Sequence, residues 1–187
     1  TMKLFFILGN QLFPTKYIDR FKKDHTFFMA EDKGLCTYEK HHKQKILLFL
    51  SSMRSYADSL KKNKFKLEYS KIEDKEFSED YLKKLKKIIT QKKIKEVSSF
   101  EIEDKPFEQK ISMFFKKEKI EWNILQTPMF LNSREEFKKY LGNSKKPFMA
   151  TLLVVSGVLM KTIEINYPKI FQYLNFLKLK RQIIQKN

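Results

Sequence analysis

The chain has little or nothing of several sequence features, and each shortage excludes a class of protein. It contains one cysteine, Cys36, which excludes an intramolecular disulfide and a cysteine-rich metal site and is typical of a reducing compartment. No apolar run is long enough to span a membrane, and the short run from Met2 to Leu8 lacks the length and cleavage site of a signal peptide. Neither G-x-G-x-x-G nor a Walker motif is present, which argues against an ordinary dinucleotide or ATP site. We therefore expect a cytoplasmic protein that does not enter a membrane.

Arginine is also scarce, although the chain is strongly basic. The formal net charge is +17, but the arginines are only Arg20, Arg54, Arg134 and Arg181. Phosphate and base recognition favours arginine, whereas lysines spread over helix surfaces are usually solvated faces. Two interpretations stay open: a compositional lysine bias, or weak, non-specific attraction to nucleic-acid backbones.

Strand and helix patterns alternate along the chain. With 42% hydrophobic residues, 187 residues can bury the core of one domain. The order predicts an α/β fold, a Rossmann-like five-stranded parallel sheet with helices on both faces and right-handed crossovers. The predicted strands are 3–8, 25–30, 65–70, 96–100 and 122–126, and the predicted helices are 39–62, 78–91, 104–119 and 133–141.

Local signals predict the ends and faces of these helices. Asn63 can end the first helix and Ser78 can cap the second. Pro106 is tolerated in the first turn of the third, and Ser133 opens the fourth with a capping box. The predicted buried stripe of the first helix consists of Ile46, Leu47, Leu50, Met53, Ala57 and Leu60, and the predicted core phenylalanines are Phe28, Phe49, Phe114 and Phe115.

Polar residues at the strand ends predict a ligand site. In parallel α/β folds, ligands bind beyond the carboxyl ends of the strands, where the strand order reverses. Loops 9–14 and 31–34 leave strands at that edge. Glu31 can accept hydrogen bonds from a bound ring or sugar, or it can pair with Lys43 or Lys45.

The sequence gives only weak indications of catalytic or metal-binding residues. His41 and His42 are adjacent, so on a helix they point about 100° apart and cannot chelate one metal from the same face. They are better explained as polar groups at a helix start, a role that is compatible with ligand contact. The acidic patch at 101–104 suggests either acid–base work or charge at a helix N-terminus. No base stands beside Cys36, and we predict no catalytic or metal-binding residue.

Five blocks of sequence together resemble one known family. Their order and spacing agree over residues 2–151 with the cryptochrome/photolyase-related family, the deoxyribodipyrimidine photolyase-related proteins of the iron–sulfur bacterial branch. The blocks are Leu8-Gly9-Asn10-Gln11-Leu12-Phe13, Met29-Ala30-Glu31, His41-His42-Lys43-Gln44-Lys45-Ile46 with Ser51-Ser52-Met53-Arg54, Phe130-Leu131-Asn132-Ser133-Arg134 and Lys146-Pro147-Phe148-Met149-Ala150-Thr151.

The resemblance implies a Rossmann-like N-terminal domain that seats an antenna chromophore such as 6,7-dimethyl-8-ribityllumazine. In complete members of the family, a helical C-terminal domain binds FAD, a four-cysteine 4Fe-4S cluster and damaged DNA. This chain has nothing that resembles that domain, so we expect neither FAD nor the cluster, and no DNA repair by this chain alone. The residues that the resemblance places in contact with the chromophore are Gly9, Asn10, Gln11, Leu12, Glu31, Tyr38, His41, His42 and Lys43.

The last part of the chain departs from the family pattern, so we divide the chain into a domain at 1–151 and an atypical tail at 152–187. The family continues with an aromatic-basic helix and then G-G-K-W-S-x-D-x-x-N-R-x-x-L-P-K. Residues 154–169 can be encoded so that reading from one base earlier gives G-G-K-W-S-V-D-E-N-D-R-N-Q-L-P-K. Either the tail is out of frame after a deletion, or it is a genuine divergent end with a strand and a basic helix. The coding DNA decides between these alternatives.

Three functions stay open at this stage. The chain can be a truncated antenna-type domain that binds a chromophore without turnover, or a subunit of a split DNA photolyase that works with a separate FAD-domain protein. It can also be a small basic nucleic-acid-binding module. A lumazine-like absorbance favours the first two, and co-purification of a flavoprotein separates them. An apolar surface made to dock on a missing domain would also favour self-association.

Overall fold

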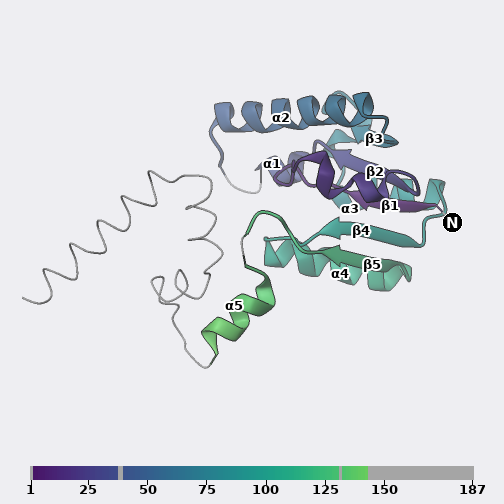
Figure 1. Ribbon diagram of the computed structural model, residues 1–187. Coiled ribbons are helices and arrows are strands. Elements are labelled where there is room, and N and C mark those ends of the chain that lie inside the picture. The colour runs from purple at the N-terminus through teal and green to yellow at the C-terminus, as the bar shows by residue number, and fades with distance from the viewer. Residues whose placement is uncertain (1, 38–39, 131, 143–187) are drawn as a thin grey trace, which may run out of the picture. The chain divides into compact units, whose positions relative to one another are not determined.

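The computed structural model describes residues 2–37, 40–130 and 132–142 (Figure 1). The chain divides into two compact units at Thr127 and Pro128, and each is described by itself. The first unit contains the whole sheet. The second contributes helix α5 (Arg134–Leu141), which opens with the predicted capping box between Ser133 and Glu136. The predicted boundary at 151–152 and the tail lie outside the described residues.

The first unit is built on a five-stranded parallel sheet, as predicted. Its order is β3-β2-β1-β4-β5. The chain passes outward from β1 through β2 to β3 and then crosses to β4 on the other side of β1, so the strand order reverses between β1 and β4. The strands are β1 (Lys3–Phe6), β2 (His25–Ala30), β3 (Leu67–Ser70), β4 (Glu96–Phe100) and β5 (Glu121–Leu125).

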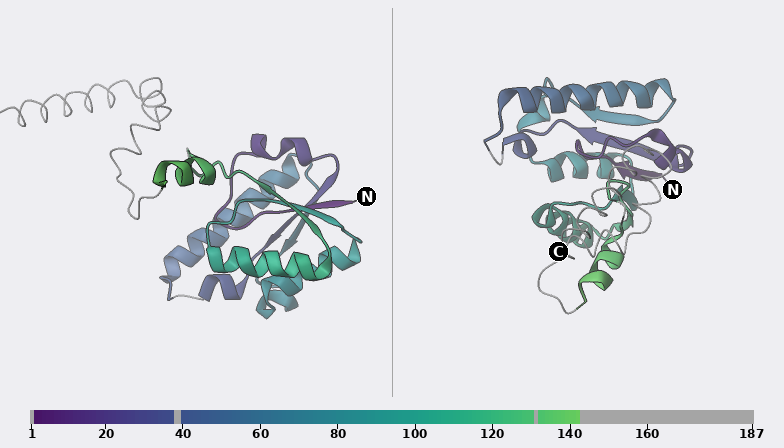
Figure 2. Two further views of the ribbon diagram at one scale, coloured as in Figure 1. Left: turned by 90° about the horizontal axis from the view of Figure 1, so that it is seen from below. Right: turned by 60° about the vertical axis from the view of Figure 1, so that its left-hand side comes forward.

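Helices cover both faces of this sheet (Figure 1, Figure 2). Side chains of a strand alternate between its faces, so neighbouring phenylalanines enter different layers. Phe6 and Phe28 pack with α3 and α4, whereas Phe5 and Phe27 pack with α2. All four are fully buried, and each contributes roughly 2–3 kcal/mol of hydrophobic stabilisation. The α-helices of this unit are α1 (Lys33–Thr37), α2 (Lys43–Lys62), α3 (Tyr81–Gln91) and α4 (Lys105–Glu118), and the 3-10 helices are η1 (Thr15–Tyr17), η2 (Asp19–Phe21) and η3 (Lys75–Ser78).

Two predicted helix starts are wrong. The first long helix was predicted to begin at residue 39, but α2 begins at Lys43. His42 has an extended backbone there and caps α2 by accepting the Gln44 N–H on Nδ1 at 3.3 Å. Helix α3 is capped by Asp80 instead of Ser78, since the Asp80 carboxylate accepts the Leu82 N–H at 2.8 Å.

The other predicted helix ends are confirmed, but the buried face of α2 is narrower than predicted. Asn63 ends α2, and Pro106 lies in the first turn of α4. On α2 the side chains of Met53, Ala57 and Leu60 are buried, whereas Leu47 is 67% exposed. Phe49 is also not a core residue: its side chain is 39% exposed. The first turns of α2 therefore extend past the hydrophobic core.

Candidate functional site

A cavity of about 240 Å³ opens at the carboxyl ends of β1, β2 and β4. It lies where the strand order reverses, the position predicted for a ligand. Its walls come from the loops after these strands and from α1, α2 and α4. The apolar lining residues are Leu8, Gly9, Ala30, Cys36, Ile46, Phe49, Met53, Ile102 and Phe107, and the polar ones are Asn10, Asp32, His41, Lys45, Glu103 and Asp104.

Gly9 lets helix α2 come close to the loop after β1. A methyl group on Gly9 would overlap Cε1 of Phe49 and lie 2.8 Å from the sulfur of Met53. The Phe49 ring therefore lies against a bare backbone and forms part of the cavity wall. The partly exposed Phe49 ring therefore lines the cavity and is not part of the hydrophobic core.

A polar clamp joins the loop after β1 to the loop after β4. The buried Gln11 side chain donates to the Glu101 carbonyl at 2.7 Å and to Glu103 Oε2 at 3.4 Å, and Asn10 Nδ2 donates to the same Glu103 oxygen at 3.3 Å. Gln11 Oε1 and Glu103 Oε1 are buried without a hydrogen-bond partner among the described residues. Asn10 and Glu103 of this clamp line the cavity, whereas Gln11 does not.

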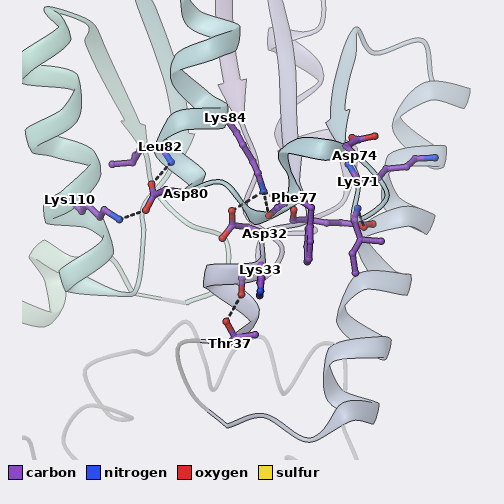
Figure 3. Close-up of polar contacts among 12 residues, drawn as sticks. Asp32, Lys33, Thr37, Lys71, Asp74, Phe77, Asp80, Leu82, Lys84 and Lys110 are labelled. Atoms are coloured by element: carbon purple, nitrogen blue, oxygen red, sulfur yellow. Dashed lines mark hydrogen bonds and ion pairs between the residues drawn. The ribbon is translucent and has the colours of Figure 1, made fainter.

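A buried ion pair stands at the end of β2 (Figure 3). Lys84 on α3 is 3% exposed, and its Nζ donates to Asp32 Oδ2 at 3.0 Å, to the Phe77 carbonyl at 3.0 Å and to the Glu31 carbonyl at 3.2 Å. These three acceptors compensate a lysine that would otherwise be costly to bury. Asp32 also lines the cavity, so the pair fixes one charged wall of it.

Glu31 is fully buried and does not line the cavity. Arg54 Nε and Nη2 donate to its two carboxylate oxygens at 2.7 and 2.9 Å, the Tyr69 hydroxyl donates at 2.6 Å and the Ile72 N–H at 2.8 Å. Burial raises the pKa of Glu31, but these hydrogen bonds outweigh burial and hold the pKa below its ordinary value. The predicted pairing with Lys43 or Lys45 is wrong, because Arg54 takes that place.

The remaining predicted contact residues separate into two groups. Gly9, Asn10 and His41 lie at the cavity, and the Lys45 Nζ is 3.5 Å from His41 Nδ1. The other described residues of the set do not line the cavity. Gln11 belongs to the clamp, Leu12 packs on the core layer under α2, Glu31 pairs with Arg54, His42 caps α2, Lys43 is exposed, and Tyr38 lies outside the described residues.

The sequence patterns missed several cavity residues. Asp32 and Phe107 carry no motif, although Lys84, which anchors Asp32, lies three residues after Tyr81 on the apolar face of α3, a signal that it would be buried. Cys36 is half-buried in the cavity wall. Burial, and then the charges of Asp32 and Glu31, raise the pKa of its thiol, so it stays protonated at neutral pH.

The described ranges, 2–37, 40–130 and 132–142, contain no group of three or more His, Cys, Asp or Glu side chains that could hold a metal ion. No helix in them combines the length and the apolar character needed to cross a membrane.

The parallel strand order, with a cavity where that order reverses, is that of a Rossmann-like α/β domain. The family model described as deoxyribodipyrimidine photo-lyase-related protein matches residues 5–152, and the chain belongs to this family. The chain is also similar to a protein of Agrobacterium fabrum (strain C58 / ATCC 33970) named (6-4) photolyase, with 26% identity over 147 residues. That match covers 76% of this chain and 29% of the relative.

Proposed function

We propose that this domain binds an antenna chromophore, a lumazine-like heteroaromatic molecule, in the cavity at the carboxyl edge of the sheet. Membership of the photolyase-related family supports the proposal, and so does the position of the cavity between β1 and β4. The proposal concerns ligand binding and light collection. The name (6-4) photolyase belongs to the relative, of which the chain spans 29%.

The main support for the proposal is that the cavity has both aromatic side chains and hydrogen-bonding side chains in its lining. Phe49 from α2 and Phe107 from α4 both line the cavity, and rings of this kind stack on planar ligands. Asp32, Asn10 and Glu103 line it as well and can hydrogen-bond the edge of a fused heterocycle. The volume of about 240 Å³ lies below the usual range for drug-sized ligands, so the ring would enter and a ribityl chain would extend from the opening.

The chemistry of the site suits an antenna. A light-collecting molecule must be bound, oriented and shielded from water, and none of these tasks needs a nucleophile or a general base. Glu31 is paired with Arg54, and the Lys84 ammonium group donates to three acceptors. These buried groups hold the cavity walls in place.

The test is a fluorescence titration of the protein with 6,7-dimethyl-8-ribityllumazine. Phe49→Ala removes a cavity wall and should weaken binding about tenfold, which corresponds to about 1.4 kcal/mol and lies within the range of an aromatic contact. Leu48→Ala is the matched control, since Leu48 precedes Phe49 on α2 but is exposed and does not line the cavity.

The control variant should bind within about twofold of the wild type, because its side chain touches no ligand. Equal weakening by the two variants would contradict a cavity site. The absence of any saturable binding by the wild type would contradict the proposed function itself.

A further inference from the structure

Three turns of the fold are built in the same unusual way. Each turn leads from a helix into the next strand, and each has a lysine in the left-handed backbone region: Lys64 with φ 59°, Lys93 with φ 52° and Lys119 with φ 55°. The next residue is apolar in every case, and its N–H bonds back to an apolar residue of the helix. These bonds are Phe65 N to Leu60 O, Ile94 N to Ile89 O and Ile120 N to Phe115 O.

The geometry is that of a Schellman motif, in which glycine is the preferred residue. A side chain at a left-handed position is strained, since its Cβ approaches the neighbouring carbonyl. Lysine therefore occupies three positions at which the turn itself favours glycine. The lysine side chains are exposed at all three.

All three turns lie at the amino edge of the sheet, opposite the cavity. The strands are parallel, so the segments that precede them meet at one edge. Backbone hydrogen bonds tie these segments to neighbouring strands: Lys3 N donates to Asp24 O, Phe27 N to Lys66 O and Glu121 N to Lys95 O. Figure 1 shows the helix-to-strand turns on the side where the N-terminus lies.

This edge carries a dense row of positive charge. The segments before β2–β5 contain twelve lysines and two carboxylates, Asp24 and Glu118. Glu118 pairs with Lys86, which is outside the row, and Asp24 contacts His25 and lies near Lys3. Glu96 and Glu121, the first residues of β4 and β5, add two carboxylates at this edge, so the lysines remain in clear excess. Lys92 pairs with Glu68, and Lys22 lies over the Phe65 ring. The lysines are Lys22, Lys23, Lys61, Lys62, Lys64, Lys66, Lys92, Lys93, Lys95, Lys116, Lys117 and Lys119.

The row follows the order of the strands. Segment 61–66 lies at one end, then come 22–24, Lys3 at the start of β1, and 92–95, and 116–119 lies at the other end. Lys3 is paired with Glu96 at 2.7 Å. With about 4.8 Å between strands, the row extends roughly 19 Å across the sheet. Among the described residues, Lys64, Lys93 and Lys119 form no ion pair with a carboxylate.

We propose that this lysine row binds the phosphate backbone of single-stranded nucleic acid. A linear row fits a linear polyanion, and a flexible strand can follow the twist of the sheet edge. Lysine acts as a point charge and does not read bases, so binding is independent of sequence and depends steeply on salt. The site is separate from the ligand cavity, which lies at the opposite edge.

The test is fluorescence anisotropy with a labelled, mixed-sequence single-stranded DNA of about 20 nucleotides, long enough to exceed the site of one small domain. The edge variant carries Lys64→Gln, Lys93→Gln and Lys119→Gln. The control variant carries Lys33→Gln, Lys71→Gln and Lys75→Gln, three exposed lysines at the carboxyl edge. Both variants lose the same charge.

At about 50 mM salt, we expect the edge variant to bind about tenfold more weakly and the control variant about twofold more weakly. The slope of log K against log salt should become shallower by about two in the edge variant, because about 0.7 is lost for each phosphate contact. A second edge variant with glycine at the three positions should lose binding equally and melt at the same or a higher temperature, since glycine relieves the backbone strain. Misfolding then cannot explain the loss.

Equal weakening by the edge and control variants would overturn the proposal, because net charge alone would then explain binding. Wild-type protein that does not bind the oligonucleotide at low salt would overturn it as well. Vesicles with anionic lipids form a further arm of the test. Binding to vesicles without binding to DNA would assign the row to a membrane surface and overturn the assignment to nucleic acid.

Discussion

Arg54 on α2 holds Glu31 at the end of β2 through two parallel hydrogen bonds of 2.7 and 2.9 Å. Arg54 also donates to Glu73 at 2.9 Å, so a single guanidinium joins helix α2, the end of β2 and the loop after β3. Glu31 belongs to the Met-Ala-Glu block and Arg54 to the Ser-Ser-Met-Arg block of the family pattern. Two sequence blocks that are far apart in the chain therefore form one structural unit. This unit fixes the helix that supplies Phe49 to the cavity.

The first prediction is a thermodynamic coupling between these two residues. Arg54→Ala leaves a buried carboxylate with fewer donors and should lower the free energy of unfolding by about 3 kcal/mol. Glu31→Gln should lower it by about 2 kcal/mol, because charge-assisted hydrogen bonds are lost. The double variant should be more stable than the sum of the two changes implies, with a coupling of about 1–2 kcal/mol. Urea unfolding of the four proteins measures this cycle.

Arg20→Ala is the control for that cycle. Arg20 is exposed and its guanidinium lies over the Phe21 ring, so the change should cost less than about 1 kcal/mol. Additive effects of the Glu31 and Arg54 changes would contradict the coupling.

The second prediction concerns pH. The pKa of folded Glu31 lies below its ordinary value of 4.5, so its contribution to stability is complete above that value and is lost as the pH falls through the folded pKa. The difference in unfolding free energy between wild type and Glu31→Gln should be largest above about pH 5 and shrink toward pH 3. Urea unfolding at each pH measures this difference.

The comparison with the Glu31→Gln variant is needed because two other carboxylates also stabilise the protein less as the pH falls. They are Asp24 and Asp80, whose pKa values are lowered by hydrogen bonds from His25 and Lys110. A constant difference between pH 3 and pH 7 would contradict the role of the Glu31 charge.

The third prediction compares the partly buried Tyr69 with the buried Tyr81, after each has lost its hydroxyl oxygen. Tyr69 donates to Glu31 at 2.6 Å, so Tyr69→Phe should cost about 1–2 kcal/mol. Tyr81 is buried, and its hydroxyl has no hydrogen-bond partner among the described residues. Tyr81→Phe should therefore leave the stability unchanged or raise it by up to about 1 kcal/mol. Thermal melts of the two variants make the comparison, and a larger loss for Tyr81→Phe than for Tyr69→Phe would contradict the described hydrogen bonding.

The fourth prediction concerns the close contact at Gly9. In Gly9→Ala the new methyl group meets Phe49 and Met53, and the partly exposed Phe49 ring can move outward. We expect a modest loss of about 1 kcal/mol in stability and about a tenfold loss in lumazine affinity, because the ring no longer forms the cavity wall. In a Phe49→Ala background the same glycine change should cost less in stability, since the nearest atom is gone. An equal cost in both backgrounds would show that Phe49 is not the residue displaced.

The strands were predictable because their patterns depend on burial alone. The predicted strands at His25–Ala30 and Glu96–Phe100 coincide with β2 and β4. Strand β2 is a largely apolar run, as a parallel sheet covered on both faces requires, whereas β4 has two buried serines, Ser98 and Ser99, between Val97 and Phe100. The location of the cavity also followed from the sequence, because the carboxyl edge of a parallel sheet is determined by the order of its elements.

The site details were not predictable, for physical reasons. Neighbouring polar residues compete to cap a helix, so the pattern could not choose Asp80 over Ser78 or locate the start of α2 at Lys43. The short helix α1 was not predicted. The choice of a partner for Glu31 depended on which turn of α2 faces the end of β2, and Arg54 lies roughly 16 Å along the helix from Lys43. A buried lysine such as Lys84 is rare. Its place on the apolar face of α3 signals burial, but its three acceptors come from other segments and could not be predicted.

The proposed chromophore can be tested most directly by native mass spectrometry, combined with an absorbance spectrum, of gently purified protein. We expect one small heteroaromatic molecule per chain, released on denaturation, with the mass and spectrum of a lumazine-type compound. A colourless protein that carries no ligand, and that does not take up added 6,7-dimethyl-8-ribityllumazine, would contradict the antenna function.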